Sequence, residues 1–170
     1  MDKLIGNFGI GHVRYPTAGG AGKEFAQPMY VNSPYGITLA HNGNLTNSKQ
    51  LSNELFRAEM RHLKTDSDSE VLLNVFAQEL GKQREIYPSA KHIFKAVKKT
   101  HIRCDGAYAV LALITGHGML AFRDNNGIRP LSIGIRKGKT RDEYIVASED
   151  ALFISLGFKK LRDIDPGEAV

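Results

Sequence analysis

The sequence has a single cysteine, Cys104, and no long apolar run. A lone cysteine cannot form an intrachain disulfide, and it lacks the spacing of a thiolate metal site. No apolar segment approaches the length that spans a bilayer, and residues 1–6 are too short and too polar for a secretory signal. These absences predict a cytoplasmic protein that has no membrane partner.

Cys104 itself allows two interpretations. The neighbouring His101 and Arg103 could create an electropositive setting for a reactive thiolate. The alternative is a small residue packed where a helix passes into a strand. We favour the second interpretation, because no orienting triad is visible near this cysteine.

Interleaved aromatic residues and nucleic-acid-binding motifs are also missing. The formal net charge is +5, but the basic residues are scattered along the chain. The densest cluster, Lys95, Lys98, Lys99 and His101, has the spacing of one solvated helix face. We therefore expect no nucleic-acid partner.

Apolar residues make up 42% of the 170 residues, which is enough for a buried core. Short apolar segments bounded by turn residues predict strands. We expect them at residues 7–14, 29–32, 37–40, 107–115, 119–123, 131–135 and 144–147. The turn residues at 33–36 and 124–127 predict two hairpins, and those at 165–167 predict a final turn.

Three helices are expected between the early and late strands. Thr46 can cap the first, and the second begins with a capping-box pattern, Ser67 followed by Glu70 at the third position. The third covers residues 90–101, and a short late helix is expected between Ser148 and Gly157. Antiparallel strands with segregated helices indicate an α+β layered sandwich.

Three polar segments could carry chemistry. The motif His-Asn-Gly-Asn at 41–44 lies where a strand is expected to end, and Asn42 and Gly43 offer a side-chain and a backbone donor for an oxyanion. An ordinary Asn-Gly turn is the alternative. Arg14 ends another expected strand and could bind a carboxylate, or it could be a surface arginine. The glycines at 9–11 lack the remaining residues of a phosphate loop.

The third segment, residues 65–70, begins a helix with three acidic residues. They could complement the helix dipole, or one could bind a substrate ammonium. The spacing does not fit an EF-hand, and a magnesium site is not favoured. Together the three segments suit an amino-acid substrate with a reactive side-chain carbonyl.

These segments closely resemble the glutaminase domain of the amidophosphoribosyltransferase family, which belongs to the class II N-terminal-nucleophile amidotransferases. The motifs that carry the resemblance are Gly-Ile-Gly-His-Val-Arg-Tyr-Pro-Thr at 9–17, Ala-Gln-Pro at 26–28, His-Asn-Gly-Asn-Leu at 41–45, Thr-Asp-Ser-Asp-Ser-Glu at 65–70, Phe-Arg-Asp-Asn-Asn-Gly-Ile-Arg-Pro-Leu at 122–131 and Val-Ala-Ser-Glu at 146–149. In the related glucosamine enzymes, tryptophan and alanine typically follow the arginine; here Tyr15 and Pro16 do.

The resemblance implies a four-layer αββα N-terminal-nucleophile hydrolase sandwich, incomplete at its N-terminal strands. It implies that Arg14 binds the α-carboxylate of L-glutamine and Asp68 its α-ammonium. It also implies that the Asn42 side chain and the Gly43 N–H form the oxyanion hole. Tyr15 and Thr17 would line the pocket.

The family's nucleophile is an N-terminal cysteine, which this sequence lacks, and Cys104 lies in a segment that is not the nucleophile. We therefore expect residues 1–170 to be a partial type-2 glutamine amidotransferase domain, without the nucleophile segment and the phosphoribosyltransferase domain, and inactive as it stands.

The intact enzyme would open de novo purine biosynthesis and would be a homo-oligomer. Phosphoribosyl pyrophosphate and magnesium would bind only through the missing domain, so no cofactor or metal is expected in this chain. Two alternatives stay open: a non-catalytic glutamine-binding or subunit-pairing module, and the glutaminase domain of a sister enzyme such as glucosamine-6-phosphate synthase.

Overall fold

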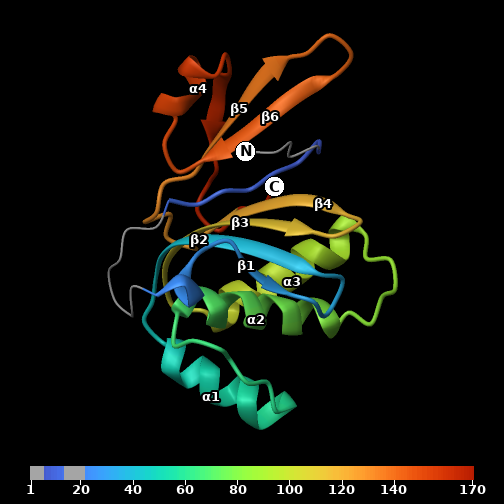
Figure 1. The fold of residues 1–170 in the computed structure, drawn as a ribbon, viewed down its shortest axis with the longest axis vertical. Coiled ribbons are helices and arrows are strands. Elements are labelled where there is room, and N and C mark those ends of the chain that lie inside the picture. The colour runs from blue at the N-terminus through green and yellow to red at the C-terminus, as the bar shows by residue number, and fades with distance from the viewer. Residues whose placement is uncertain (1–5, 14–21) are drawn as a thin grey trace.

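The structure, a computed structural model, describes residues 6–13 and 22–170 and contains two antiparallel sheets (Figure 1). The first sheet has the strand order β1-β2-β3-β4, and the second has the order β6-β5-β7. The elements are a 3-10 turn Lys23–Phe25, β1 Met29–Val31, β2 Ile37–Leu45, α1 Ser48–Glu59, α2 Asp68–Gly81, α3 Ala90–Arg103, β3 Gly106–Ile114, β4 Gly118–Arg123, β5 Ser132–Lys137, β6 Asp142–Ala147, α4 Ala151–Ser155 and β7 Lys159–Asp163.

Helices cover one face of the four-stranded sheet, and the three-stranded sheet lies on its other side (Figure 1). The strand β3 is buried on both faces because it lies between these layers. Tyr108 and Val110 pack into the core with the helices, whereas Ala109 packs with Leu131 and Ile164 between the sheets. This arrangement confirms the predicted layered fold of helices and antiparallel sheets.

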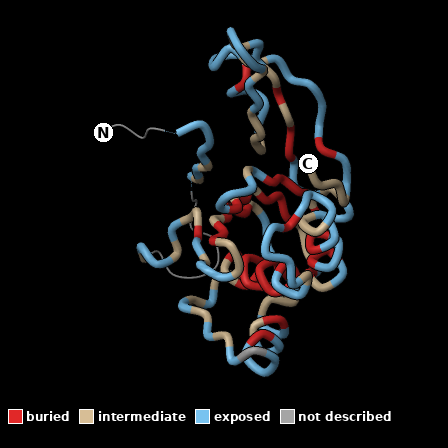
Figure 2. Tube along the Cα trace, turned by 90° about the vertical axis from the view of Figure 1, so that its right-hand side faces the viewer, coloured by how far each residue is buried: buried red, intermediate tan, exposed pale blue. Residues whose placement is uncertain are grey.

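The helix α2 is the centre of the larger core. Every residue from Val71 to Leu80 is buried, so the helix is enclosed on all sides (Figure 2). Ser67 caps it as predicted, because the Ser67 Oγ accepts a hydrogen bond from the Ser69 N–H. Glu70 does not complete the capping box: its Oε2 accepts from Thr65 N at 2.7 Å. The start of α2 is therefore braced by the loop before it.

Several predicted boundaries are wrong. Residues 7–13 form no strand, and residue 14 lies outside the described residues. The strand predicted at 37–40 continues to Leu45. The first helix begins after Asn47 rather than after a Thr46 cap, and α4 begins after Asp150 rather than at Ser148.

The turn at residues 124–127 is real, but it is not a hairpin. The Gly127 N–H donates to the Asp124 carbonyl at 3.0 Å, as in a tight turn. However, the flanking strands β4 and β5 lie in different sheets, so the turn is part of the crossing between layers. Turn residues predict a change of direction, and they do not determine which strands then pair.

None of the helices in residues 6–13 and 22–170 combines the length and the apolar character that crossing a bilayer requires.

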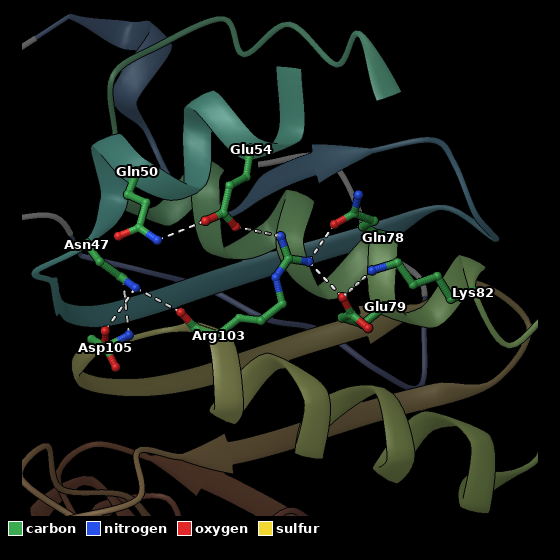
Figure 3. Close-up of polar contacts among 8 residues, drawn as sticks. All are labelled: Asn47, Gln50, Glu54, Gln78, Glu79, Lys82, Arg103 and Asp105. Carbon is green, nitrogen blue, oxygen red and sulfur yellow. Dashed lines mark hydrogen bonds and ion pairs between the residues drawn. The ribbon is translucent and has the colours of Figure 1, made fainter. Parts of the chain in front are cut away.

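Arg103, at the end of α3, links three helices (Figure 3). Its Nη1 donates to Gln78 Oε1 at 2.5 Å and to Glu79 Oε1 at 2.7 Å, both on α2. Its Nη2 lies 3.6 Å from Glu54 Oε2 on α1. The Glu79 side chain is only 6% exposed, and Lys82 is its other cationic partner.

Arg103→Met should lower the free energy of unfolding by roughly 2–3 kcal/mol, because it leaves the buried Glu79 carboxylate with one partner and Gln78 without its donor. Arg136→Met is the matched control. Its guanidinium pairs with Glu143, donates to the Leu156 carbonyl and lies over the Phe158 ring, but both charged side chains are 45% exposed. No buried charge loses its partner, so the loss should be smaller than that of Arg103→Met. Equal losses in urea unfolding would contradict this account of the helix contacts.

Candidate functional site

Asn42 and Gly43 lie within a strand and not at a corner. They belong to β2 and pair with Ala109 and Tyr108 of β3. Gly43 has φ 141°, and a Cβ on it would lie 1.9 Å from the Ala107 carbonyl oxygen. Only glycine fits such a close approach of two strands. Strand packing therefore requires the glycine of this motif, and the interpretation as an ordinary turn is wrong because both residues lie within β2.

β1 pairs with residues 37–39 of β2, and within residues 6–13 and 22–170 no strand pairs with the rest of this outer edge of β2. Along this edge the His41 N–H donates to Gln27 Oε1 at 2.7 Å, and the Leu45 N–H donates to Asp68 Oδ2 at 3.0 Å. Backbone N–H groups alternate between the two edges of a strand, so the Gly43 N–H is directed to the same edge. It lies between Gln27 and Asp68.

The structure brings Asp68 to this edge from α2. Asp68 is the first residue of the helix, where the positive end of the helix dipole favours a carboxylate. Its Oδ2 holds the Leu45 N–H, and its Oδ1 lies 4.0 Å from His41 Nδ1. Two of the predicted segments, residues 41–44 and 65–70, are thus side by side.

Sequence reasoning assigned no role to His41, which connects the same two elements. The His41 side chain is 1% exposed, and its Nδ1 lies 3.0 Å from Ser69 Oγ in the first turn of α2. Burial lowers the pKa of His41 to about 4, and the charges of His12 and Arg129 act in the same direction, against the opposing effect of Asp68. His41 is therefore neutral near pH 7.

Two further residues, Gln27 and His12, contact this strand. The Gln27 side chain acts as an extra strand partner, because its Nε2 also donates to the His41 carbonyl at 3.2 Å. His12 lies in the N-terminal segment 6–13, and its Nε2 is 2.8 Å from Asn42 Oδ1. No local pattern marks either contact, since both partners are distant in the sequence.

The remaining candidates divide into three groups. Arg14, Tyr15 and Thr17 lie outside the described residues. Glu70 holds the Lys64 and Thr65 N–H groups, so it is a structural partner of the loop. Cys104 caps the end of α3 and is buried, and burial raises the pKa of its thiol to about 12. This confirms the interpretation of Cys104 as a packed residue at a helix-to-strand junction.

Known proteins match this chain along its whole length. A family model described as a glutamine amidotransferase domain matches residues 20–155. The chain is 57% identical over 170 residues to an amidophosphoribosyltransferase of Pseudomonas aeruginosa, and 57% identical over 171 residues to one of Escherichia coli K12. Each match covers 100% of this chain and 34% of the relative, so the chain spans about a third of these proteins.

Two solved structures are also similar. The glutamine phosphoribosylpyrophosphate amidotransferase from Bacillus subtilis, complexed with ADP and GMP, matches with a TM-score of 0.70 and 36% identity, covering 93% of this chain and 31% of that one. A structure described as the allosteric regulatory enzyme of purine biosynthesis matches with a TM-score of 0.71 and 38% identity over the same shares.

Gly43→Ala should destabilise the fold, because the new methyl group would meet the Ala107 carbonyl and the backbone would be strained. Gly118→Ala is the control: Gly118 has φ 121°, but no atom of the described part of the chain would lie within 4 Å of its new methyl group. We expect the Gly43 variant to lose at least about 2 kcal/mol more than the control in urea unfolding. Similar losses would mean that the strand contact is unimportant.

The low pKa of His41 predicts acid sensitivity. Unfolding returns its pKa from about 4 to 6.5, so the unfolded chain binds more protons below pH 6.5 and stability declines as the pH falls toward 4. Between pH 7 and pH 5 this histidine should account for a loss of roughly 2 kcal/mol in unfolding free energy. His41→Gln should show a correspondingly shallower decline in urea titrations at the two pH values, and an unchanged slope would disprove the assignment.

Proposed function

Since this chain belongs to the family of glutamine amidotransferase domains, in its amidophosphoribosyltransferase branch, we propose that it is the glutamine-binding, ammonia-supplying domain of such an enzyme. The matches confirm the predicted family and the predicted fold. The named relatives favour amidophosphoribosyltransferase over its sister enzymes. The activity of the longer protein, its substrates and its partners are part of the proposal.

The observation that carries the proposal is the meeting of Asp68 with the outer edge of β2. Asp68 would bind the α-ammonium of glutamine. The Asn42 amide and the Gly43 N–H, on the same stretch of strand, would stabilise an oxyanion on the side-chain carbonyl. Arg14 would bind the α-carboxylate, with Tyr15 and Thr17 lining the pocket. The hydrogen bond from the Leu45 N–H to Asp68 Oδ2 supports the proposal, because it keeps Asp68 beside the strand that carries Asn42 and Gly43.

In the longer enzyme we propose the following course. A cysteine thiolate attacks the glutamine carboxamide carbon and forms a tetrahedral intermediate, whose oxyanion is held by Asn42 and Gly43. Collapse of this intermediate breaks the C–N bond, releases ammonia and leaves a thioester. Water then releases glutamate. Ammonia displaces pyrophosphate from phosphoribosyl pyrophosphate in a second, magnesium-dependent domain, at the start of purine synthesis. We further propose that this enzyme is a cytoplasmic homo-oligomer.

The 170-residue chain itself is proposed to bind glutamine without cleaving it. The one cysteine in its sequence is Cys104, and a buried thiol with a pKa near 12 is not a nucleophile at neutral pH. Donors that stabilise an oxyanion do not replace the attacking group.

Glutamine binding tests the proposed pocket. Asp68→Asn should raise the Kd for L-glutamine at least about tenfold in titration calorimetry, because a charged hydrogen-bonding partner of the ammonium is removed. The control is Asp66→Asn, an exposed acid two residues away on the same segment, which should leave the Kd unchanged. Equal affinities in all three proteins would rule out Asp68 as the ammonium site.

Ammonia release tests the proposal that the chain does not cleave glutamine. The chain incubated with L-glutamine should release no ammonia above the buffer background in a coupled dehydrogenase assay. Cys104→Ser should behave identically. Release that the Cys104→Ser change abolishes would show that this thiol reacts after all, and it would overturn the proposal of a binding domain without a nucleophile.

A further inference from the structure

The hydrogen bond between His12 and Asn42 determines which way the Asn42 amide faces. His12 Nε2 lies 2.8 Å from Asn42 Oδ1. A carbonyl oxygen can only accept, so the proton of this bond must be on the His12 Nε2. The opposite arrangement would need an unprotonated Nε2 facing the amide NH₂ group. The tautomer of His12 and the orientation of Asn42 are therefore coupled.

The environment of the second ring nitrogen favours the first arrangement. His12 Nδ1 is buried and has no hydrogen-bond partner among the described residues. In the Nε2-protonated tautomer this atom is a bare acceptor. In the other tautomer it would be a buried N–H without a partner, and orphaned buried N–H groups are rarer in proteins than unsatisfied acceptors. The ring is thus biased to donate to Asn42.

The orientation matters because the two ends of an amide are chemically opposite. With Oδ1 occupied by His12, the Nδ2 protons stay available as donors. A reversed amide would present a carbonyl oxygen instead, which repels a developing oxyanion. Asn42 and His41 are adjacent on β2, so their side chains point to opposite faces of the sheet. His41 points to the face that packs on α2, where it contacts Ser69. Asn42 points to the opposite face, and His12 contacts it there.

We propose that His12 is a positioning residue that holds the Asn42 amide with its Nδ2 directed at the substrate. The fixed orientation follows from the described contacts, whereas the identity of the acceptor, the side-chain carbonyl of glutamine, rests on the proposed function. His12 itself does not touch the reacting atoms in this assignment. It acts through Asn42.

The tautomer of His12 provides a test that needs no ligand. In ¹⁵N-labelled chain at pH 8, two-bond ¹H–¹⁵N spectra distinguish a protonated ring nitrogen from an unprotonated one. The His12 signals are assigned by their disappearance in His12→Gln, and the exposed His62 serves as the internal reference. We expect a protonated Nε2 and an unprotonated Nδ1. A protonated Nδ1 would overturn the proposal.

Ligand selectivity provides the second test. His12→Phe keeps a ring but frees the amide to turn its oxygen toward the ligand. The NH₂ group of L-glutamine can donate to that oxygen, whereas the γ-carboxylate of L-glutamate carries only acceptors. The Kd for glutamate should therefore rise at least about tenfold more than the Kd for glutamine in calorimetry. His12→Gln, whose Nε2 can replace the lost donor, should restore the wild-type ratio.

The outcomes separate the two proposals. A ratio unchanged in His12→Phe, with both affinities lowered alike, would reduce His12 to a purely structural role and overturn the positioning assignment. If wild-type chain binds neither amino acid, the proposed function fails, and the ring tautomer alone then decides the orientation of Asn42. Thermal melting of each variant shows whether the fold is retained.

Discussion

The contact between the outer edge of β2 and the first turn of α2 is the interaction on which the candidate site depends. The Leu45 N–H bonds to Asp68, and His41 bonds to Ser69, so one strand and one helix are joined at two points. The helix is enclosed by the core and cannot shift without disturbing it. The distance between the Asp68 carboxylate and β2 is therefore set by the packing of α2 in the core, far from the site.

The inner side of β2 is supported in a different way. Gly43 lies against β3 so closely that no side chain fits, and its partner Tyr108 is held in place by Asp124. The fully buried Asp124 carboxylate also accepts from the N–H groups of Asn126, Ile128 and Arg129. Burial alone would raise the pKa of Asp124, but these backbone hydrogen bonds lower it, so the carboxylate remains charged.

Local patterns predicted the elements well and their pairing poorly. The apolar run of β3 and the Ser67 cap of α2 were visible in the sequence, because both depend on neighbouring residues. The strand β7 gave no signal: Lys159–Asp163 is exposed throughout and rich in charge, as edge strands often are. The turn after β4 looked like a hairpin because turn chemistry is local, whereas the choice of sheet is not.

The sequence by itself determined which polar groups the candidate site can use: an amide and a glycine at positions 42 and 43, and a carboxylate at 68. The burial of the Cys104 thiol became visible only in the tertiary structure. Tertiary structure alone decided that Asp68 reaches Leu45, that Gln27 extends the sheet along His41, and that His12 orients Asn42. These partners are 14 to 30 residues apart. Hydrogen bonds over such separations leave no periodic trace in a sequence, because they form only once the core has brought the elements together.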